Sequence, residues 1–235
     1  MTHFITFGTR PLYDRALERI EREARSSGYF DTVTVYTQEN LPQLREHADF
    51  VAKNPRGYGY WIWKPMAILE QMRKVPEGDI ILYADAGCSI CTTHEARRVW
   101  NIWLDIVRTG STHRIAFIEG HVEETWCKAD LACLLGCHDD PTIMKSCISI
   151  STLHLLQNTE DNRALVQRWI DVCLLEDYHY LTDSPSRVPN AASFREHRHD
   201  QSIISLLMKI YGASRIPAPF IAPGYPVLCL RSRDA

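Results

Sequence analysis

The chain has 235 residues, of which 45% are hydrophobic and 23% charged, and its formal net charge is -3. These proportions are typical of a globular protein, and the length suits one domain spanning residues 1–235. A weakly negative net charge gives no electrostatic footprint for nucleic acid, so we expect no nucleic-acid partner. No uninterrupted apolar run approaches the roughly 18 residues of a membrane span, so we expect no transmembrane segment.

The amino-terminal residues lack the basic and apolar regions of a signal peptide, and we therefore expect a cytoplasmic location. Among the eight cysteines, Cys88 and Cys91 form a single C-x-x-C, without a second pair at zinc-site spacing. We expect the cysteines to pack as small hydrophobic residues in the core rather than to bind zinc or form disulfides.

The first half of the chain alternates strands and helices. Short apolar or β-branched runs predict strands over residues 4–7, 32–36 and 79–84. Helical spacing of apolar residues predicts helices over 13–26 and 39–51 and a third that starts near Pro65. The glycine-broken segment 54–59 is predicted to be a loop.

The second half continues the alternation. The predicted helices span residues 96–107, 128–135, 164–175 and 201–211, and the predicted strands span 115–118 and 148–150. A polar, proline-bearing loop is expected over 181–196 and an irregular tail over 217–226. The alternation predicts a single α/β domain with helices covering a central sheet.

A mostly apolar strand ends abruptly at Ala84-Asp85-Ala86-Gly87. In open α/β sheets, ligands bind at the carboxyl ends of the strands, and the small Ala86 would leave room there. Gly87 would permit an unusual turn. A carboxylate at such a position suits magnesium or manganese bridged to substrate phosphates. The alternative is that Asp85 caps the turn that follows.

A polar cluster precedes the last predicted helix and consists of His197, Arg198, His199, Asp200 and Gln201. Asp200 could cap this helix, since a side-chain oxygen satisfies free amides at a helix start. In the functional alternative the helix start is a charged pocket. Histidine would then ligate a metal, arginine would pair with phosphate, and Asp200 would position or deprotonate a hydroxyl.

An aromatic segment precedes the third helix and contains Tyr58, Tyr60, Trp61 and Trp63, followed by Lys64. Its aromatic rings either belong to the core or stack on a base or a sugar ring. Lys64 is either solvated or contacts the phosphates or sugar of a ligand.

Residues 57–65, 79–87 and 197–202 together resemble a family of GT-A-type glycosyltransferases that includes the amino-terminal domain of a multidomain chlorella-virus protein. In this family an Ala-Asp-Ala-Gly segment replaces the common Asp-x-Asp motif. The resemblance implies a nucleotide-binding α/β/α sandwich with a mixed, mainly parallel central sheet. It also implies a nucleotide-sugar donor, in the first place a UDP-sugar, a glycan or other hydroxyl acceptor, and a divalent metal, Mn²⁺ before Mg²⁺. A viral protein would act in the cytoplasm of its host.

The resemblance assigns roles to individual residues. Asp85 is the expected metal ligand, and His197 or His199 is a candidate second ligand because Ala86 stands where many relatives keep a second acid. Asp200 and Gln201 are the expected catalytic pair. The implied donor contacts are Thr6, Phe7, Gly8, Thr9, Trp61, Lys64, Ala84, Asp85, Ala86, Gly87 and Arg198.

The sequence leaves the stereochemistry and the reaction class open. In an inverting enzyme Asp200 would take the proton of the acceptor, and in a retaining enzyme Asp200 and Gln201 would face the anomeric carbon. A metal-dependent nucleotide-sugar hydrolase or nucleotidyl-transferring enzyme is one alternative. A non-catalytic sugar- or nucleotide-binding module is another.

Overall fold

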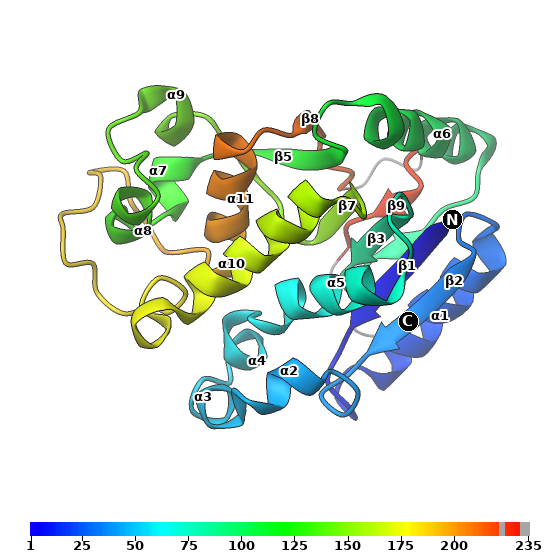
Figure 1. The fold of residues 1–235 in the computed structure, drawn as a ribbon, viewed down its shortest axis with the longest axis horizontal. Helices are drawn as coiled ribbons and strands as arrows, with labels where there is room; N and C mark the ends of the chain where they lie inside the picture. The colour runs from blue at the N-terminus through cyan, green and yellow to red at the C-terminus, as the bar shows by residue number, and fades with distance from the viewer. Residues whose placement is uncertain (221–223, 231–235) are drawn as a thin grey trace.

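A computed structural model describes residues 1–220 and 224–230 of the chain (Figure 1). Residues 221–223, which fall in the expected irregular tail, and residues 231–235 lie outside the described part. A seven-stranded sheet has the order β2-β1-β3-β7-β5-β6, with β8 beside β5, and β4 pairs with β9 apart from it. The strands are β1 (Thr2–Phe7), β2 (Thr32–Tyr36), β3 (Ile80–Ala84), β4 (Ser89–Ile90), β5 (Arg114–Val122), β6 (Cys147–Ser149), β7 (Leu153–Gln157), β8 (Ser214–Pro217) and β9 (Val227–Leu228).

Strand directions make the sheet mixed and mainly parallel, as predicted. β1 runs parallel to both β2 and β3, and β5 runs parallel to β8. β7 is antiparallel to its neighbours β3 and β5, and β6 is antiparallel to β5. β1, β2, β3, β5 and β8 therefore point one way, and β6 and β7 point the other.

Helices cover both faces of the sheet, which confirms the expected α/β sandwich. They are α1 (Asp14–Ser27), α2 (Pro42–Arg45), α3 (Ala48–Lys53), α4 (Gly57–Tyr60), α5 (Trp63–Lys74), α6 (His94–Thr109), α7 (Glu123–Trp126), α8 (Ala129–Leu134), α9 (Pro141–Met144), α10 (Glu160–Tyr178) and α11 (Asp200–Ile210). α5, α10 and α11 lie over one face (Figure 1), while α1 and α6 pack on the other.

The alternation of side chains along β3 shows how the two faces arise. Ile81 and Tyr83 join the apolar cluster beneath α5 and α10, whereas Ile80, Leu82 and Ala84 join the cluster beneath α1 and α6. All five side chains are buried. A strand covered on both faces is expected to be continuously apolar, so this composition identifies β3 as a central strand.

The structure differs from the prediction at strand β7 and over residues 39–51. Strand β7 was not predicted, because its sequence, Leu-His-Leu-Leu-Gln, is rich in leucine and does not alternate. Pairing with β3 on one side and β5 on the other fixes it as a strand nonetheless. The helix predicted over 39–51 was wrong in extent, since the chain forms α2 and α3 with a break at Glu46–His47.

Most cysteine predictions are confirmed. Cys88, Cys127, Cys137, Cys173 and Cys229 are buried, and all eight cysteines are free. The expectation that the apolar run around Cys133 would bury it was wrong, since that thiol is exposed near the end of α8. Within the described residues, no helix is both long and apolar enough to cross a membrane.

Candidate functional site

The candidate site lies at one edge of the sheet, where β1, β2 and β3 end. Because these strands are parallel, the residues that follow Phe7, Tyr36 and Ala84 reach the same edge. The antiparallel strand β7 starts there as well, since Ala84 pairs with Leu153. The carboxyl edge of parallel strands is the usual ligand position in α/β folds.

A buried lysine lies at the centre of this edge. Lys64, in the first turn of α5, is only 2% exposed. Its ammonium donates to the carbonyl of Ser151 at 2.6 Å and forms ion pairs with Asp85 at 3.2 Å and Asp200 at 3.5 Å. Burial alone would lower the pKa of Lys64, but the two carboxylates outweigh burial and hold this pKa above its ordinary value. The alternative of a solvated Lys64 was therefore wrong.

Asp200 is the buried carboxylate of the pair. Its Oδ2 accepts a hydrogen bond of 2.5 Å from the Ser151 hydroxyl as well as the contact from Lys64. Burial raises the pKa of Asp200 to about 6, although Lys64 acts in the opposite direction. The side chain makes these contacts rather than capping α11, so the capping alternative does not describe Asp200.

Two residues of this network were missed in the sequence. Ser151 joins the carbonyl contact of Lys64 to the hydroxyl contact of Asp200, and its hydroxyl also lies 3.3 Å from Nε2 of His154. His154 is fully buried against Trp169, and burial lowers its pKa to about 3, so its ring is neutral. Their position next to the site follows from β7, the strand that the sequence did not predict.

Asp85 is the accessible carboxylate, with 32% of its side chain exposed. Its Oδ1 accepts from the hydroxyl of the buried Tyr83 and pairs with Lys64. Its Oδ2 makes no hydrogen bond to any described residue and remains available to a ligand. Neither contact is a helix cap or a side-chain turn, so the capping alternative does not describe Asp85 either.

The described side chains offer few ligands for a divalent metal. No group of three or more His, Cys, Asp or Glu side chains in residues 1–220 and 224–230 is arranged to hold a metal ion. Of the two carboxylates that pair with Lys64, Asp85 is the one with a partly exposed side chain. A single carboxylate oxygen fits a hard cation such as Mg²⁺ or Mn²⁺ that takes its remaining ligands from substrate phosphates and water.

The two candidate metal ligands, His197 and His199, are held by hydrogen bonds to the main chain. Both ring nitrogens of His197 lie near main-chain groups, the amide of Lys128 at 3.4 Å and the carbonyl of Tyr180 at 2.9 Å. Nδ1 of His199 bonds the carbonyl of Leu181 at 2.9 Å, and its Nε2 faces the carboxylate of Asp183 at 3.7 Å. Metal binding by His197 would require the loss of one of these bonds, and the contacts of neither histidine include Asp85.

Gln201 lies at the rim of the network. Its amide nitrogen donates to Glu119 at 2.8 Å and to the carbonyl of Ser149 at 3.1 Å. These two bonds fix the orientation of the amide group, and its oxygen accepts no hydrogen bond from a described residue. Gln201 lies in the first turn of α11, and its role beside a transferred sugar stays a prediction.

The remaining predicted donor contacts divide into edge and core positions. Gly8 and Thr9 follow β1 at the edge, but the side chains of Thr6 and Phe7 are buried, with Phe7 stacked on Trp63 at 4.0 Å. Any contact of Thr6 or Phe7 with a ligand would therefore use the main chain. The Thr6 hydroxyl is buried without a hydrogen-bond partner among the described atoms.

The segment after Asp85 is held from below by Arg19 of α1. The guanidinium donates to the carbonyls of Ala86 at 3.0 Å and Cys88 at 2.8 Å. Ala86 is buried, as is Ala84. Gly87 was expected to permit an unusual turn, but its φ is not positive, so the turn does not require glycine for its backbone angle.

The contacts of Arg198 lie away from the ion pair between Asp85 and Lys64. Its guanidinium lies 4.1 Å from the centre of the Trp126 ring and 3.1 Å from Glu196. The structure thus gives it a cation–π partner and a carboxylate partner and does not bring it to Lys64. Its predicted phosphate contact stays a prediction.

Strained backbone is concentrated beside this edge. Apart from His113, the described non-glycine residues with positive φ lie in segments 58–61 and 176–178 and at His199. The first segment makes α4 a left-handed turn instead of the predicted loop, and each such residue costs about 1–2 kcal/mol. The three segments meet through contacts between rings: Tyr60 and Trp61 contact His199, and Phe50 contacts both Tyr60 and Tyr178.

Comparisons with known proteins give structural similarity alone. No protein-family model matches the chain, and no curated protein sequence matches it. The chain is similar to the apo form of the glycosyltransferase GlyE from Streptococcus pneumoniae TIGR4, with 14% identity over 91% of this chain and a TM-score of 0.43. It spans 44% of GlyE, which is less than half of that protein.

Two further solved structures align over similar lengths. Mouse xyloside xylosyltransferase 1 shares 13% identity over 92% of this chain and 85% of its own, with a TM-score of 0.45. Galactosyltransferase LgtC, bound to donor and acceptor sugar analogs, shares 12% identity over 91% of this chain and 72% of its own, with a TM-score of 0.46. At this level of similarity we draw no functional conclusion from these proteins.

Proposed function

We propose that the chain is a metal-dependent glycosyltransferase that moves a sugar from a nucleotide-sugar donor, in the first place a UDP-sugar, to a hydroxyl of a glycan or other acceptor. The observation that carries this proposal is the cluster of Asp85, Lys64 and Asp200. One buried ammonium holds an accessible carboxylate and a buried carboxylate at the carboxyl edge of three parallel strands. In such a site Asp85 could bind a metal together with the donor phosphates, and Asp200 could take part in proton transfer.

On the donor side, Asp85 would bind the metal, and Lys64 would offset negative charge near the donor phosphates. Asp85 would hold a divalent cation through its carboxylate, and the chemistry supplied there would be Lewis-acid stabilisation of negative charge on the leaving phosphate. Lys64 and Tyr83 fix the Asp85 carboxylate through Oδ1, and Oδ2 has no hydrogen-bond partner among the described residues. Because Lys64 is buried between Asp85 and Asp200, its positive charge offsets part of the negative charge of these two carboxylates and so lowers their repulsion of an anionic donor.

On the reaction side, Asp200 is the candidate general base, and because it is only 3% exposed the site must open at this residue before an acceptor hydroxyl can reach it. With a pKa of about 6 it is mostly ionised at pH 7 yet basic enough to accept a proton from a hydroxyl. The sugar–phosphate bond breaks, the acceptor oxygen forms the new bond to the anomeric carbon, and in an inverting reaction the acceptor proton passes to Asp200. Gln201, with its amide oriented by Glu119, would bind a hydroxyl of the transferred sugar.

On the acceptor side, the strained segments are the candidate surface. Left-handed residues that are not glycine persist only where the surrounding packing imposes them, and such strain is commonly found at ligand sites. Nε2 of His199 is buried without a hydrogen bond to any described residue, next to the half-buried rings of Tyr60 and Trp61. A hydroxyl-bearing ring stacked on these aromatic groups would supply the missing donor to Nε2.

The proposal is tested by titrating UDP- and GDP-sugars into the protein by calorimetry, with and without Mn²⁺. We expect metal-dependent binding of at least one donor, reduced about 10- to 100-fold by Asp85→Asn, which removes the charged oxygen ligand. The exposed Asp139→Asn is the matched control and should leave the affinity unchanged. Absence of nucleotide binding under every condition would contradict the proposal, and an unchanged affinity of Asp85→Asn would make Asp85 a structural residue.

A further inference from the structure

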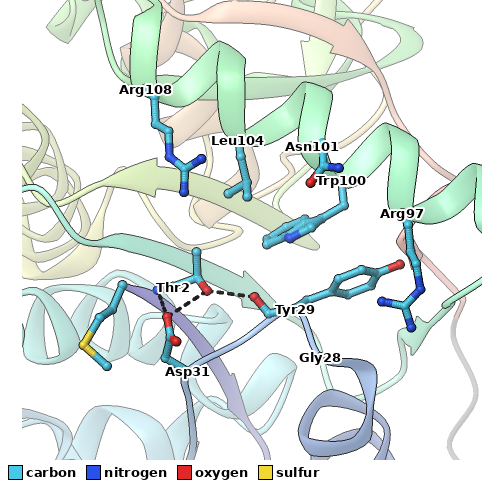
Figure 2. Close-up of a pocket in the computed structure, with 10 residues that line it drawn as sticks. Thr2, Gly28, Tyr29, Asp31, Arg97, Trp100, Asn101, Leu104 and Arg108 are labelled. Atoms are coloured by element: carbon cyan, nitrogen blue, oxygen red, sulfur yellow. Dashed lines mark hydrogen bonds between the residues drawn. The ribbon is translucent and has the colours of Figure 1, made fainter.

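A polar cavity that is open to solvent lies at the edge of the sheet opposite the candidate site, where β1 begins, and its Arg97, Asn101 and Arg108 are exposed. Figure 2 shows this cavity, of about 360 Å³, between α6 and the residues around Thr2 and Asp31. Arg97, Asn101 and Arg108 line it from α6 and share one face of that helix, because they are separated by four and seven residues. The candidate site at Asp85 uses none of these residues.

The cavity carries two guanidinium groups without carboxylate partners. Among the described residues, neither Arg97 nor Arg108 has a carboxylate within ion-pair distance, whereas Arg98 on the same helix pairs with Glu95 at 2.8 Å. The guanidinium of Arg97 lies 5.4 Å from the ring centre of Tyr29, and this contact holds it at one end of the cavity. Figure 2 places Arg108 at the other end.

The rest of the lining adds hydrogen-bond donors and one carboxylate, so the charged side chains Arg97, Arg108 and Asp31 together carry a charge of +1. The indole N–H of Trp100 and the amide of Asn101 make no hydrogen bond to a described residue. Asp31 is the carboxylate of the lining, and its Oδ2 accepts from the main-chain N–H of Thr2 at 2.6 Å and from the Thr2 hydroxyl at 3.2 Å. A lining in which unpaired donors exceed free acceptors fits an anionic ligand.

We propose that this cavity binds an elongated ligand with an anionic group at each end, one on Arg97 and the other on Arg108. Eleven helical residues separate the two Cα atoms by about 16 Å, and with the two guanidinium groups at opposite ends of the cavity (Figure 2) one small anion does not reach both. Carboxylates and phosphates both match the planar fork of a guanidinium. The ligand is therefore an acidic oligosaccharide or a bisphosphate, two sources that share this chemistry.

The test is calorimetric titration of the full chain with trigalacturonate, hexane-1,6-diol bisphosphate and the monophosphate hexyl phosphate. We expect at least one of the two probes with separated anionic groups to bind about tenfold or more tightly than hexyl phosphate. Arg97→Ala and Arg108→Ala should each weaken that binding about tenfold. Arg98→Ala, a neighbouring exposed arginine with a partner, should change it less than about twofold.

Several outcomes separate this cavity from ordinary surface charge. If neither probe with separated anionic groups binds at millimolar concentration, if hexyl phosphate binds as well as they do, or if Arg98→Ala weakens binding as much as Arg97→Ala, the proposal is overturned. Circular dichroism confirms that each variant is folded, and Arg97→Lys tests whether charge alone suffices. Asp85→Asn should bind the same probe unchanged, so the result does not depend on the proposed transferase activity.

Discussion

At the scale of single residues, the site depends on a lysine whose three protons are all used. The ammonium of Lys64 meets the Ser151 carbonyl, Asp85 and Asp200, which matches the three donors of the group. Such complete pairing allows a charged lysine to remain buried. The pairing also makes the two carboxylates unequal, because Asp200 is enclosed while Asp85 keeps a free oxygen at the surface.

Removal of the ammonium should destabilise the fold in a pH-dependent way. Lys64→Met leaves Asp200 buried and without its cation, and we expect the free energy of unfolding at pH 7.5 to fall by about 3–5 kcal/mol. The pKa of Asp200 is about 6 in the folded protein against 3.8 for an ordinary aspartate, and loss of Lys64 raises it further. The ionised carboxylate therefore costs stability above that pKa, and the cost disappears as the pH falls below it.

Urea denaturation at pH 7.5 and pH 5 measures this difference. The penalty of Lys64→Met should be clearly smaller at pH 5, where the buried carboxyl takes up a proton. Lys74→Met is the matched control, since that lysine is exposed and its contacts, with Glu70 four residues earlier and with the ring of Tyr36, are each of a type worth about 1 kcal/mol or less. Equal penalties for Lys64→Met at both pH values would contradict a charge-dependent role of Lys64.

At the scale of elements, the chain concentrates strained turns where the candidate acceptor surface lies. The end of α10 is one of them, with Glu176, Asp177 and Tyr178 all at positive φ. These residues precede the loop whose carbonyls bond His197 and His199. A left-handed turn at this point reverses the chain and directs that loop back toward the start of α11.

A glycine substitution in this turn and one in the preceding part of α10 should change the free energy of unfolding in opposite directions. Asp177 has φ 55° and an exposed side chain, so Asp177→Gly should raise the free energy of unfolding by about 0.5–1 kcal/mol. Asp171 is exposed on the same helix in regular geometry, and Asp171→Gly should lower the free energy of unfolding by about 1 kcal/mol. Chemical denaturation of both variants gives the two signs, and a destabilised Asp177→Gly would show that the turn is not strained.

The sequence predicted the elements whose patterns are local. The strands ending at Phe7 and Ala84 and the helix starting near Lys64 follow from apolar runs and from proline, and together they place Asp85 and Lys64 at one edge. Strand β7 depends on pairing with both neighbours, which no local pattern reveals. Without β7, the bonds of Ser151 and His154 to the network were not predictable.

The polar cluster at 197–201 shows a second limit of sequence patterns. Charged and neutral histidines look alike in a sequence, and only burial decides between them. His197 and His199 are enclosed and bonded to main-chain carbonyls, so they support the loop instead of forming the predicted charged pocket. Asp200, which follows His199 directly, is the member of the cluster whose carboxylate meets Lys64.

At the scale of the whole molecule, buried neutral histidines make the fold sensitive to acid. Burial lowers the pKa of His154 to about 3 and that of His199 to about 4, and it holds the pKa of His197 well below its ordinary value. Unfolding exposes these rings, which then take up protons below a pH of about 6.5. Their contribution to stability is complete above that pH and is lost as the pH falls toward the folded pKa values.

The net effect can be predicted from the number of protons. Between pH 6 and 5, each of the histidines His154, His197 and His199 lowers the free energy of unfolding by at most about 1.4 kcal/mol per pH unit. Asp200, whose pKa is raised in the folded protein, acts in the opposite direction and offsets the effect of about one histidine. We therefore expect the free energy of unfolding to fall by roughly 2–3 kcal/mol per pH unit in this range.

Urea denaturation across the pH range measures that slope. His154→Asn should reduce the slope by about one proton even if it also lowers the overall stability, because the slope counts protons and not packing. His138→Gln, at an exposed position, is the control and should leave the slope unchanged. A slope of zero between pH 6 and 5 would contradict the neutral state of the buried rings.

The most direct test of the central claim is a steady-state comparison of Asp85→Asn and Asp200→Asn with a UDP-sugar that the wild-type protein turns over. The two carboxylates are assigned different roles, so their losses should differ. Asp85→Asn is expected to raise the KM for the donor about tenfold or more. Asp200→Asn is expected to lower kcat by about 100-fold or more with little change in that KM. A folded Asp200→Asn variant with wild-type kcat would contradict the account.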